Sequence, residues 1–286
     1  GQASKKQIIE DLGWKGYTLE QIIAKNAEFF TIETNDGLGI KLFSSFGFTK
    51  DELNKIQTYL TDYIGDKEYL FPSDLMIDME FEDELSEILA DRGILKIYDF
   101  ASLIKYFNPE LRGFHQFLFI KNSYYDQFEK VVKEEFPTFL IRNEFEKYFI
   151  KKGYALSGLP SSLGTLVEQQ FFYPYTTSKY VNAKEVMITD EILVELQQYL
   201  DQVLEDKEYI SALDLTGYTN LPSSGNYEWT PHLVAHFASK IGYTIINTTR
   251  DYRYNKILLM SKRLGITQYD QLVYKVLKEE YEGNYH

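Results

Sequence analysis

The chain has 286 residues, 44% of them hydrophobic, and a formal net charge of −13. The negative charge repels phosphate backbones at long range, and the absence of cysteine excludes disulfides, thiolate zinc sites and cysteine nucleophiles. No stretch approaches the roughly 18 uncharged apolar residues of a membrane helix, and the first residues do not resemble a secretory signal. We therefore expect a cytoplasmic protein without a membrane partner, long enough for about two domains.

Residues 1–47 are expected to form a small N-terminal segment. Apolar residues recur at helical spacing in two short stretches. The sequence Asn35-Asp36-Gly37 then favours a tight turn between two strands. The segment is therefore predicted to contain two short helices and a hairpin.

Residues 48–140 are expected to form the first larger domain. Its first helix should begin at Thr49, because Thr49 and Glu52 have the spacing of a capping box. The remaining predicted elements are helices at 81–93 and 98–107 and a strand at 117–122.

Residues 188–286 are expected to form the second larger domain, after a linking segment at 141–187 that is a poor counterpart of 1–47. Thr189 can cap one helix, and Thr230 followed by proline marks the start of another, which Gly242 ends. The remaining predicted elements are a short helix within 209–215, strands at 243–247 and 255–261, and a last helix from near Thr267.

Two parts of the chain resemble each other. Residues 48–75 align with 188–215 without a gap, and 11 of the 28 positions are identical. A second similar pair begins at Tyr125 and Tyr269, in the same order along the chain. Two matches at nearly the same spacing indicate an internal tandem duplication. The alternative is two amphipathic helices that are similar by coincidence.

The order of predicted elements in 188–286 is helix, short helix, helix, strand, turn, strand, helix. This order resembles the winged-helix variant of helix-turn-helix domains, and the resemblance is one of element order alone. It implies an α+β, mainly α chain of tandem duplicated units, each with a winged-helix-like domain of helices and a small β-hairpin. The segment 1–47 would be a smaller, partial version of such a domain. The resemblance also implies that the third helix and the hairpin are the places to look for DNA contacts.

One basic stretch fits that expectation. Residues 248–264 carry five cations against Asp251 alone, a net charge of +4, with two tyrosines among them. Basic and aromatic side chains on a hairpin suit phosphate contact and base stacking, and the preceding helix adds polar groups. The candidate nucleic-acid-binding residues are Arg250, Tyr252, Arg253, Tyr254, Lys256, Lys262, Arg263, His232, His236 and Lys240. The alternative is that they solvate the hairpin and offset the acidic helix at 189–208, whose net charge is −6.

No residues have the spacing of a catalytic or metal site. His232 and His236 lie four residues apart, on one face of a predicted helix, but the glutamate of the zinc-peptidase pattern is missing between them. The chain has only four histidines and no cysteine to complete a metal site. We therefore expect no catalytic residue, no metal, no cofactor and no small-molecule substrate.

Two functions from different classes remain. Residues 77–92, which include the presumed third helix of the first repeat, have a net charge of −6. Such a surface is repelled by a DNA groove. The first hypothesis is therefore a non-catalytic module that binds a protein partner within a larger protein or complex. The alternative is a DNA-binding transcriptional or DNA-processing regulator that uses the basic hairpin of the second repeat.

Overall fold

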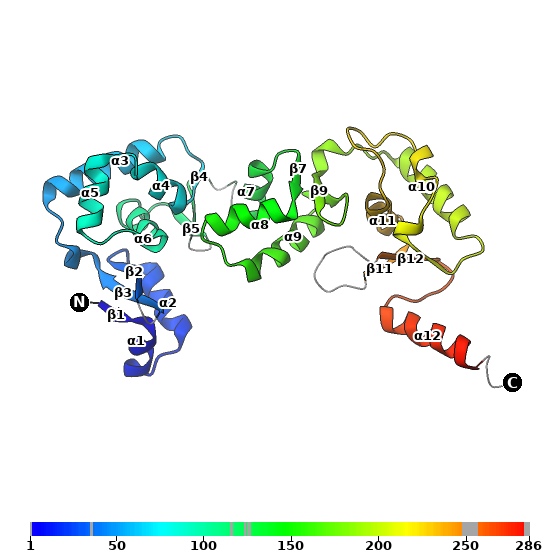
Figure 1. Ribbon diagram of the computed structural model, residues 1–286, viewed down its shortest axis with the longest axis horizontal. Coiled ribbons are helices and arrows are strands. Elements are labelled where there is room, and N and C mark those ends of the chain that lie inside the picture. Colours follow the sequence, from blue (N-terminus) through cyan, green and yellow to red (C-terminus); the bar gives the residue numbers. More distant parts are fainter. Residues whose placement is uncertain are drawn as a thin grey trace. The chain divides into compact units, whose positions relative to one another are not determined.

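The computed structural model describes residues 2–34, 37–114, 117–122, 124, 127–247 and 257–282. In these ranges the chain is mixed α/β, with helices and four small antiparallel sheets of three strands each (Figure 1). The chain divides into two compact units, the first made of Gly1–Val131 and Tyr148–Tyr154, the second of Val132–Lys147 and Ala155–His286. None of the described helices has both the length and the apolar composition of a membrane span.

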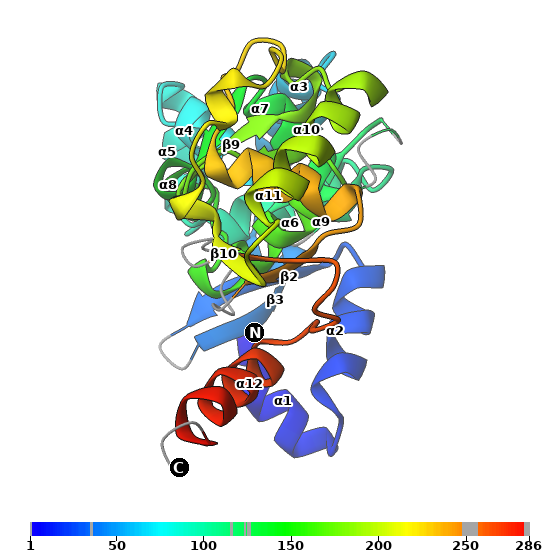
Figure 2. The ribbon, with the colours of Figure 1, turned by 90° about the vertical axis from the view of Figure 1, so that its right-hand side faces the viewer.

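The N-terminal segment builds the first sheet. Its elements are β1 (Gln2–Ser4), α1 (Lys5–Leu12), α2 (Gly16–Lys25), β2 (Phe29–Thr34), β3 (Gly37–Leu42) and the 3-10 turn η1 (Phe43–Phe46). Ser4 caps α1 by accepting a hydrogen bond from the Gln7 amide at 3.1 Å. β2 and β3 lie side by side next to α2 (Figure 2), and Leu19, Ile23 and Ile40 form the buried cluster between helices and sheet. The predicted pair of helices and the pairing of the two strands are confirmed, whereas Asn35 and Asp36 of the predicted turn lie outside the described residues. The strand β1 was not predicted.

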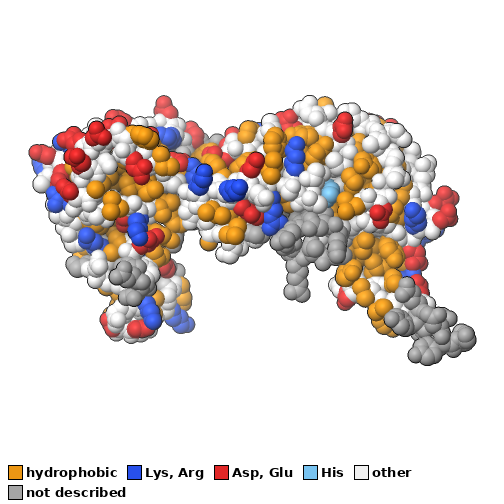
Figure 3. Space-filling view, in the orientation of Figure 1, with side chains coloured by type: hydrophobic (Ala, Val, Ile, Leu, Met, Phe, Trp, Pro, Cys, Tyr) orange, Lys and Arg blue, Asp and Glu red, His pale blue; other side chains and the backbone are white. Residues whose placement is uncertain are grey.

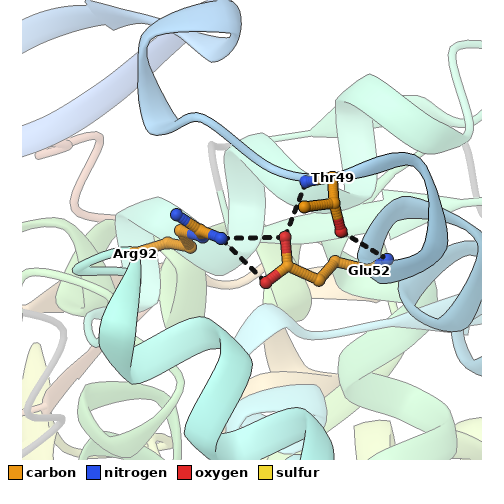
Figure 4. A network of polar contacts seen from close by, with 3 residues as sticks. All are labelled: Thr49, Glu52 and Arg92. Atoms are coloured by element: carbon orange, nitrogen blue, oxygen red, sulfur yellow. Dashed lines mark hydrogen bonds and ion pairs between the residues drawn. The ribbon is translucent and has the colours of Figure 1, made fainter.

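The second sheet follows a long helix with a well-defined start. The elements are α3 (Lys50–Ile64), β4 (Tyr69–Leu70), α4 (Pro72–Met79), α5 (Asp83–Asp91), α6 (Ile97–Phe107), β5 (Arg112–Phe114) and β6 (Leu118–Ile120). The predicted capping box is confirmed. The Thr49 hydroxyl accepts from the Glu52 amide at 3.3 Å, and the Glu52 carboxylate accepts from the Thr49 amide at 2.6 Å (Figure 4).

Arg92, just after α5, joins the same network. Its guanidinium donates to both oxygens of the Glu52 carboxylate, at 2.8 and 2.9 Å (Figure 4). The hydrogen bond from the Thr49 amide and then those from Arg92 lower the pKa of the Glu52 carboxyl. The start of α3 is thereby tied to the end of α5.

The helix that directly precedes the hairpin β5–β6 is α6. The sequence had placed the third helix of this segment within 77–92, where α5 lies. Three helices separate β4 from this hairpin. α6 has its own start, because the Asp99 carboxylate accepts from the amides of Leu95 and Lys96 at 3.0 and 2.9 Å. α6 therefore occupies the place before the hairpin that the sequence assigned to the helix within 77–92.

A short segment returns to the first unit after the chain has left it. Phe149, near the end of α8 (Arg142–Lys151), is fully buried, and its ring centroid lies 4.7 Å from that of Phe128 and 5.5 Å from that of Tyr154. Phe71 completes the group at 6.2 Å. Aromatic pairs in edge-to-face geometry contribute about 0.5–1.5 kcal/mol each beyond their burial. These contacts hold residues 148–154 in the first unit.

The third sheet occupies the segment that the sequence suggested was a link. Its elements are α7 (Phe128–Glu135), β7 (Phe139–Ile141), α8, the 3-10 turn η3 (Leu156–Gly158), α9 (Leu159–Glu168), β8 (Phe172–Pro174), β9 (Lys179–Asn182) and the 3-10 turn η4 (Ala183–Glu185). Each of the three strands has only three or four residues. Strands this short show little alternation of apolar and polar residues, so no strand was predicted here.

The fourth sheet lies in residues 188–286, the predicted second larger domain. Its elements are α10 (Asp190–Val203), β10 (Tyr209–Ser211), the 3-10 turns η5 (Ala212–Asp214) and η6 (Tyr218–Asn220), α11 (Pro231–Lys240), β11 (Thr244–Asn247), β12 (Ile257–Met260) and α12 (Tyr269–Glu282). The predicted caps Thr189 and Thr230 are confirmed, since each hydroxyl accepts from a backbone amide of its helix. The short helix predicted within 209–215 is instead a strand followed by a 3-10 turn, because Ile210 pairs with Leu259 of β12.

All four sheets share one strand order, in which the last strand lies between the first and the second. In three of them a backbone hydrogen bond extends the pairing of the first and last strands by one residue. The amides of Lys121, Asn182 and Ser261 donate to the carbonyls of Glu68, Thr138 and Glu208 at 2.9, 2.8 and 2.7 Å. The similar segments 48–75 and 188–215 thus enter their sheets in the same register. Tyr69 lies opposite Ile120, and Tyr209 lies opposite Met260.

The loop after η6 is anchored to the end of the third sheet. Val186 and Gly225 form an antiparallel bridge, and the Met187 amide donates to the Ser224 carbonyl at 2.8 Å. Gly225 has a φ of +96°, and a Cβ placed on it would lie 2.9 Å from the Glu185 carbonyl oxygen and 3.0 Å from the Met187 nitrogen. Both the backbone conformation and the close contact therefore require glycine.

We expect Gly225→Ala to lower the free energy of unfolding by about 3 kcal/mol, because it adds a backbone clash to the left-handed strain. Gly242→Ala is the matched control, since Gly242 has a φ of +88° with nothing within 4 Å of its Cβ position. It should cost about 1 kcal/mol. Urea denaturation of both variants measures the difference. Equal losses would show that no close contact exists at Gly225.

Candidate interaction surfaces

The structure describes five of the ten predicted nucleic-acid-binding residues. Arg250, Tyr252, Arg253, Tyr254 and Lys256 lie outside the described residues. The other five are described: His232, His236 and Lys240 on α11, and Lys262 and Arg263 after β12. The surroundings of these five show what each side chain does in the folded chain.

The two histidines of α11 face the interior. His232 is only 5% exposed. The ring of His236 lies 4.7 Å from that of Tyr173, and its Nε2 is buried without a hydrogen-bond partner. Burial, and to a smaller extent the charge of Lys240, lower the pKa of His236 to about 3. A half-buried imidazole that is neutral at pH 7 cannot form an ion pair with phosphate, and the described contacts of His236 are those of an aromatic packing residue.

Lys240 covers aromatic rings. Its ammonium lies 4.6 Å from the ring centroid of Tyr173 and 4.8 Å from that of Phe237, and donates to the Gln170 side chain at 3.1 Å. Partial burial lowers the pKa of Lys240. This cation is therefore used to cover the same aromatic group that contains His236.

Both cations after β12 lie near the acidic helix α10, Arg263 at its end and Lys262 beside a tyrosine that binds the helix. The Arg263 guanidinium donates to the carbonyls of Leu204, at 3.0 Å, and Glu205, at the C-terminal end of α10. Lys262 lies 4.2 Å from the ring centroid of Tyr243, whose hydroxyl donates to Asp201 at 2.5 Å. Both cations thus stabilise the packing of the fourth sheet against α10.

A different surface stands out on the first unit. Three apolar side chains around α4 and α5 are largely exposed: Ile77 by 51%, Phe81 by 80% and Leu95 by 63%. We call these residues, together with the carboxylates of 77–92, the acidic apolar surface. The sequence shows the charge of this surface. It does not show which apolar residues are exposed, because the same segment also contains the buried residues Met79, Leu85 and Leu89.

The charge of this surface is largely uncompensated. Its only cation, Arg92, is engaged with Glu52 of α3, and Lys55 of α3 pairs with Glu84. Among the described residues, no cation pairs with the four carboxylates Glu80, Glu82, Asp83 and Glu87. Figure 3 shows Asp and Glu side chains gathered over α3 and α5 with apolar side chains among them.

A narrow crevice of about 60 Å³ runs through the acidic apolar surface. Its floor is formed by buried residues that include Met79, Leu89 and Ile94. Exposed Glu80 and Leu95 lie at its rim. The crevice thus combines an apolar floor with acidic and apolar edges.

A larger hollow of about 310 Å³ lies elsewhere in the first unit, bordered by α2, β2, α6 and β5. The two charged side chains that line it already bind other groups of the protein. Lys105 donates to the carbonyls of Ile23 and Asn26, and Glu20 accepts from Lys5 at 2.8 Å. No charged group among the described lining residues is thus left to orient a ligand. Within the described ranges, no three His, Asp or Glu side chains converge as a metal site would require.

We expect His236→Phe to weaken the dependence of stability on pH. The folded pKa of about 3 is below the usual 6.5, so the unfolded chain takes up a proton that the folded chain does not. This contribution to stability is complete above pH 6.5 and falls as the pH drops, by up to about 1.4 kcal/mol per pH unit. The phenylalanine variant should lack this slope and be at least as stable at pH 7, because no unpaired Nε2 remains.

Urea denaturation of both proteins between pH 7 and pH 5 measures this slope. Parallel curves for wild type and His236→Phe would show that His236 is protonated in the folded chain, and phosphate contact by its imidazole would again be a possible role.

The sequence matches no protein-family model, and it matches no curated protein. The function of the acidic apolar surface is therefore argued from its exposure, charge and packing alone.

Proposed function

We propose that the chain is a non-catalytic, protein-binding module built from four tandem winged-helix-like units, and that the acidic apolar surface is a binding surface. The proposed units are 2–46, 50–120, 128–185 and 190–260. Three features support them: the strand order common to all four sheets, the helix before the first strand in three of them, and the hairpin that ends each one. The equivalent register of Tyr69 and Tyr209 supports an origin by duplication.

The observation that carries the binding proposal is the exposure of Phe81 and Leu95 within a strongly acidic segment. Large apolar side chains so exposed are unfavourable in water, and contiguous apolar surface with a polar rim is typical of protein-binding sites. The surrounding carboxylates oppose contact with nucleic acid. A protein partner satisfies both features.

The DNA-binding alternative depends on fewer residues than the sequence suggested. Lys240, Lys262 and Arg263 have contacts within the fold, and His236 is neutral. Arg250, Arg253 and Lys256 lie outside the described residues, and Asp251 among them reduces their charge to a net +2. A net charge of this size gives weak, salt-sensitive binding at best.

We expect no mobility shift of duplex or single-stranded DNA by about 10 μM chain in low salt, because nonspecific binding needs several free cations. A complex that weakens with salt, and that is lost in Arg250→Ala/Arg253→Ala, would contradict this expectation and establish the alternative.

Protein binding is tested by cross-linked capture from extracts of the native organism. The double variant Phe81→Asp/Leu95→Asp should lose the specific partner that wild type retains, because a charge replaces each apolar contact. Met187→Asp is the matched control, since Met187 is exposed by 68% and lies outside the acidic apolar surface. Identical captures by all three proteins would contradict the proposal.

A further inference from the structure

We infer that the acidic apolar surface binds a cationic amphipathic helix of the partner protein. This inference rests on the proposed protein-binding function and specifies the chemistry of the partner. It follows from three properties of the surface: the apolar crevice beside Leu95, the sign of the charge and the kind of element that borders the crevice.

One of the exposed apolar groups lines a crevice. Leu95 lines it directly, together with Met76 and Glu80. Met76 is the chain neighbour of Ile77, and Glu80 is the neighbour of Phe81. Leu95 therefore exposes an apolar side chain beside a hollow whose floor is already apolar, an arrangement that accepts an apolar side chain from outside, and Ile77 and Phe81 are exposed next to lining residues along the chain.

The charge selects a cationic partner. Glu80, Glu82, Asp83 and Glu87 have no cation partner among the described residues. Lysine or arginine side chains placed beside the apolar residues of a partner would meet these carboxylates at the rim. Such rim charges mainly speed association and select the partner, whereas the apolar contact supplies most of the affinity.

The bordering elements favour a helix over an extended peptide. The crevice is lined by α4, α5 and the residues leading into α6, so no strand edge is exposed in it. An extended peptide would need a free sheet edge, and the edge strands β4 and β5 have only two and three residues. A helix in a groove needs no backbone pairing. Its apolar residues would recur at i, i+3, i+4 and i+7, flanked by lysine or arginine.

The probe is a fluorescent peptide of about 18 residues, made of leucine and lysine with the leucines on one helix face. A second peptide has the same composition with the leucines distributed around the helix. Anisotropy titrations with the full chain should show at least tenfold weaker binding of the second peptide, because it cannot present one apolar face.

Variants locate the binding site. Phe81→Ala and Leu95→Ala should each weaken binding of the first peptide about fivefold to tenfold. Met187→Ala should leave binding unchanged, since it removes an equally exposed apolar side chain elsewhere. Glu80→Gln/Glu82→Gln should reduce the salt dependence of binding. All four variants change exposed positions, and circular dichroism verifies that they fold.

Several results would overturn the inference: no binding of the first peptide below about 100 μM, equal binding of both peptides, or equal losses in Phe81→Ala and Met187→Ala. If any of these occurs while cross-linked capture still depends on Phe81 and Leu95, the surface binds a protein that is not a cationic helix. If capture is also independent of both residues, the proposed function fails as well.

Discussion

The pairing of the first strand of each sheet with its last is the constraint on which the rest of the structure depends. The helices and turns between these two strands must fit within the loop that this pairing closes. The backbone hydrogen bonds from Lys121, Asn182 and Ser261 extend the same closure in three of the four sheets. With only two to four residues in most strands, the sheets cannot be stable alone. The buried helix faces stabilise them, as the fully buried Leu60, Leu103 and Leu200 illustrate.

The sequence predicted helix starts well, because a cap is a local signal. Thr49, Thr189 and Thr230 each accept the backbone hydrogen bond that their position suggested. It predicted short strands poorly, because the pairing of β10 or β7 is decided by a partner strand far along the chain. The segment 209–215 contains apolar residues at spacings compatible with a helix, and pairing with β12 overrides that preference.

For the candidate site, too, the sequence predicted local properties but not the contacts between distant residues. The net charge of 77–92 follows from the sequence alone, because it depends only on which residues are present. The sequence could not show that Lys240 covers Tyr173 or that Arg263 binds the carbonyls at the end of α10. Cations near an acidic helix can serve folding or binding, and only the contacts of each side chain distinguish the two. For the five described candidates, the contacts serve folding.

The return of residues 148–154 to the first unit has a consequence for how the protein can be divided. The polypeptide passes between the two units three times, after residues 131, 147 and 154. A fragment ending at residue 140 would lose Phe149 from between Phe71 and Phe128, and would separate most of β7 from β9. No single cleavage can release either unit with its core complete. Because the polypeptide crosses between them three times, neither unit is one continuous stretch of the sequence.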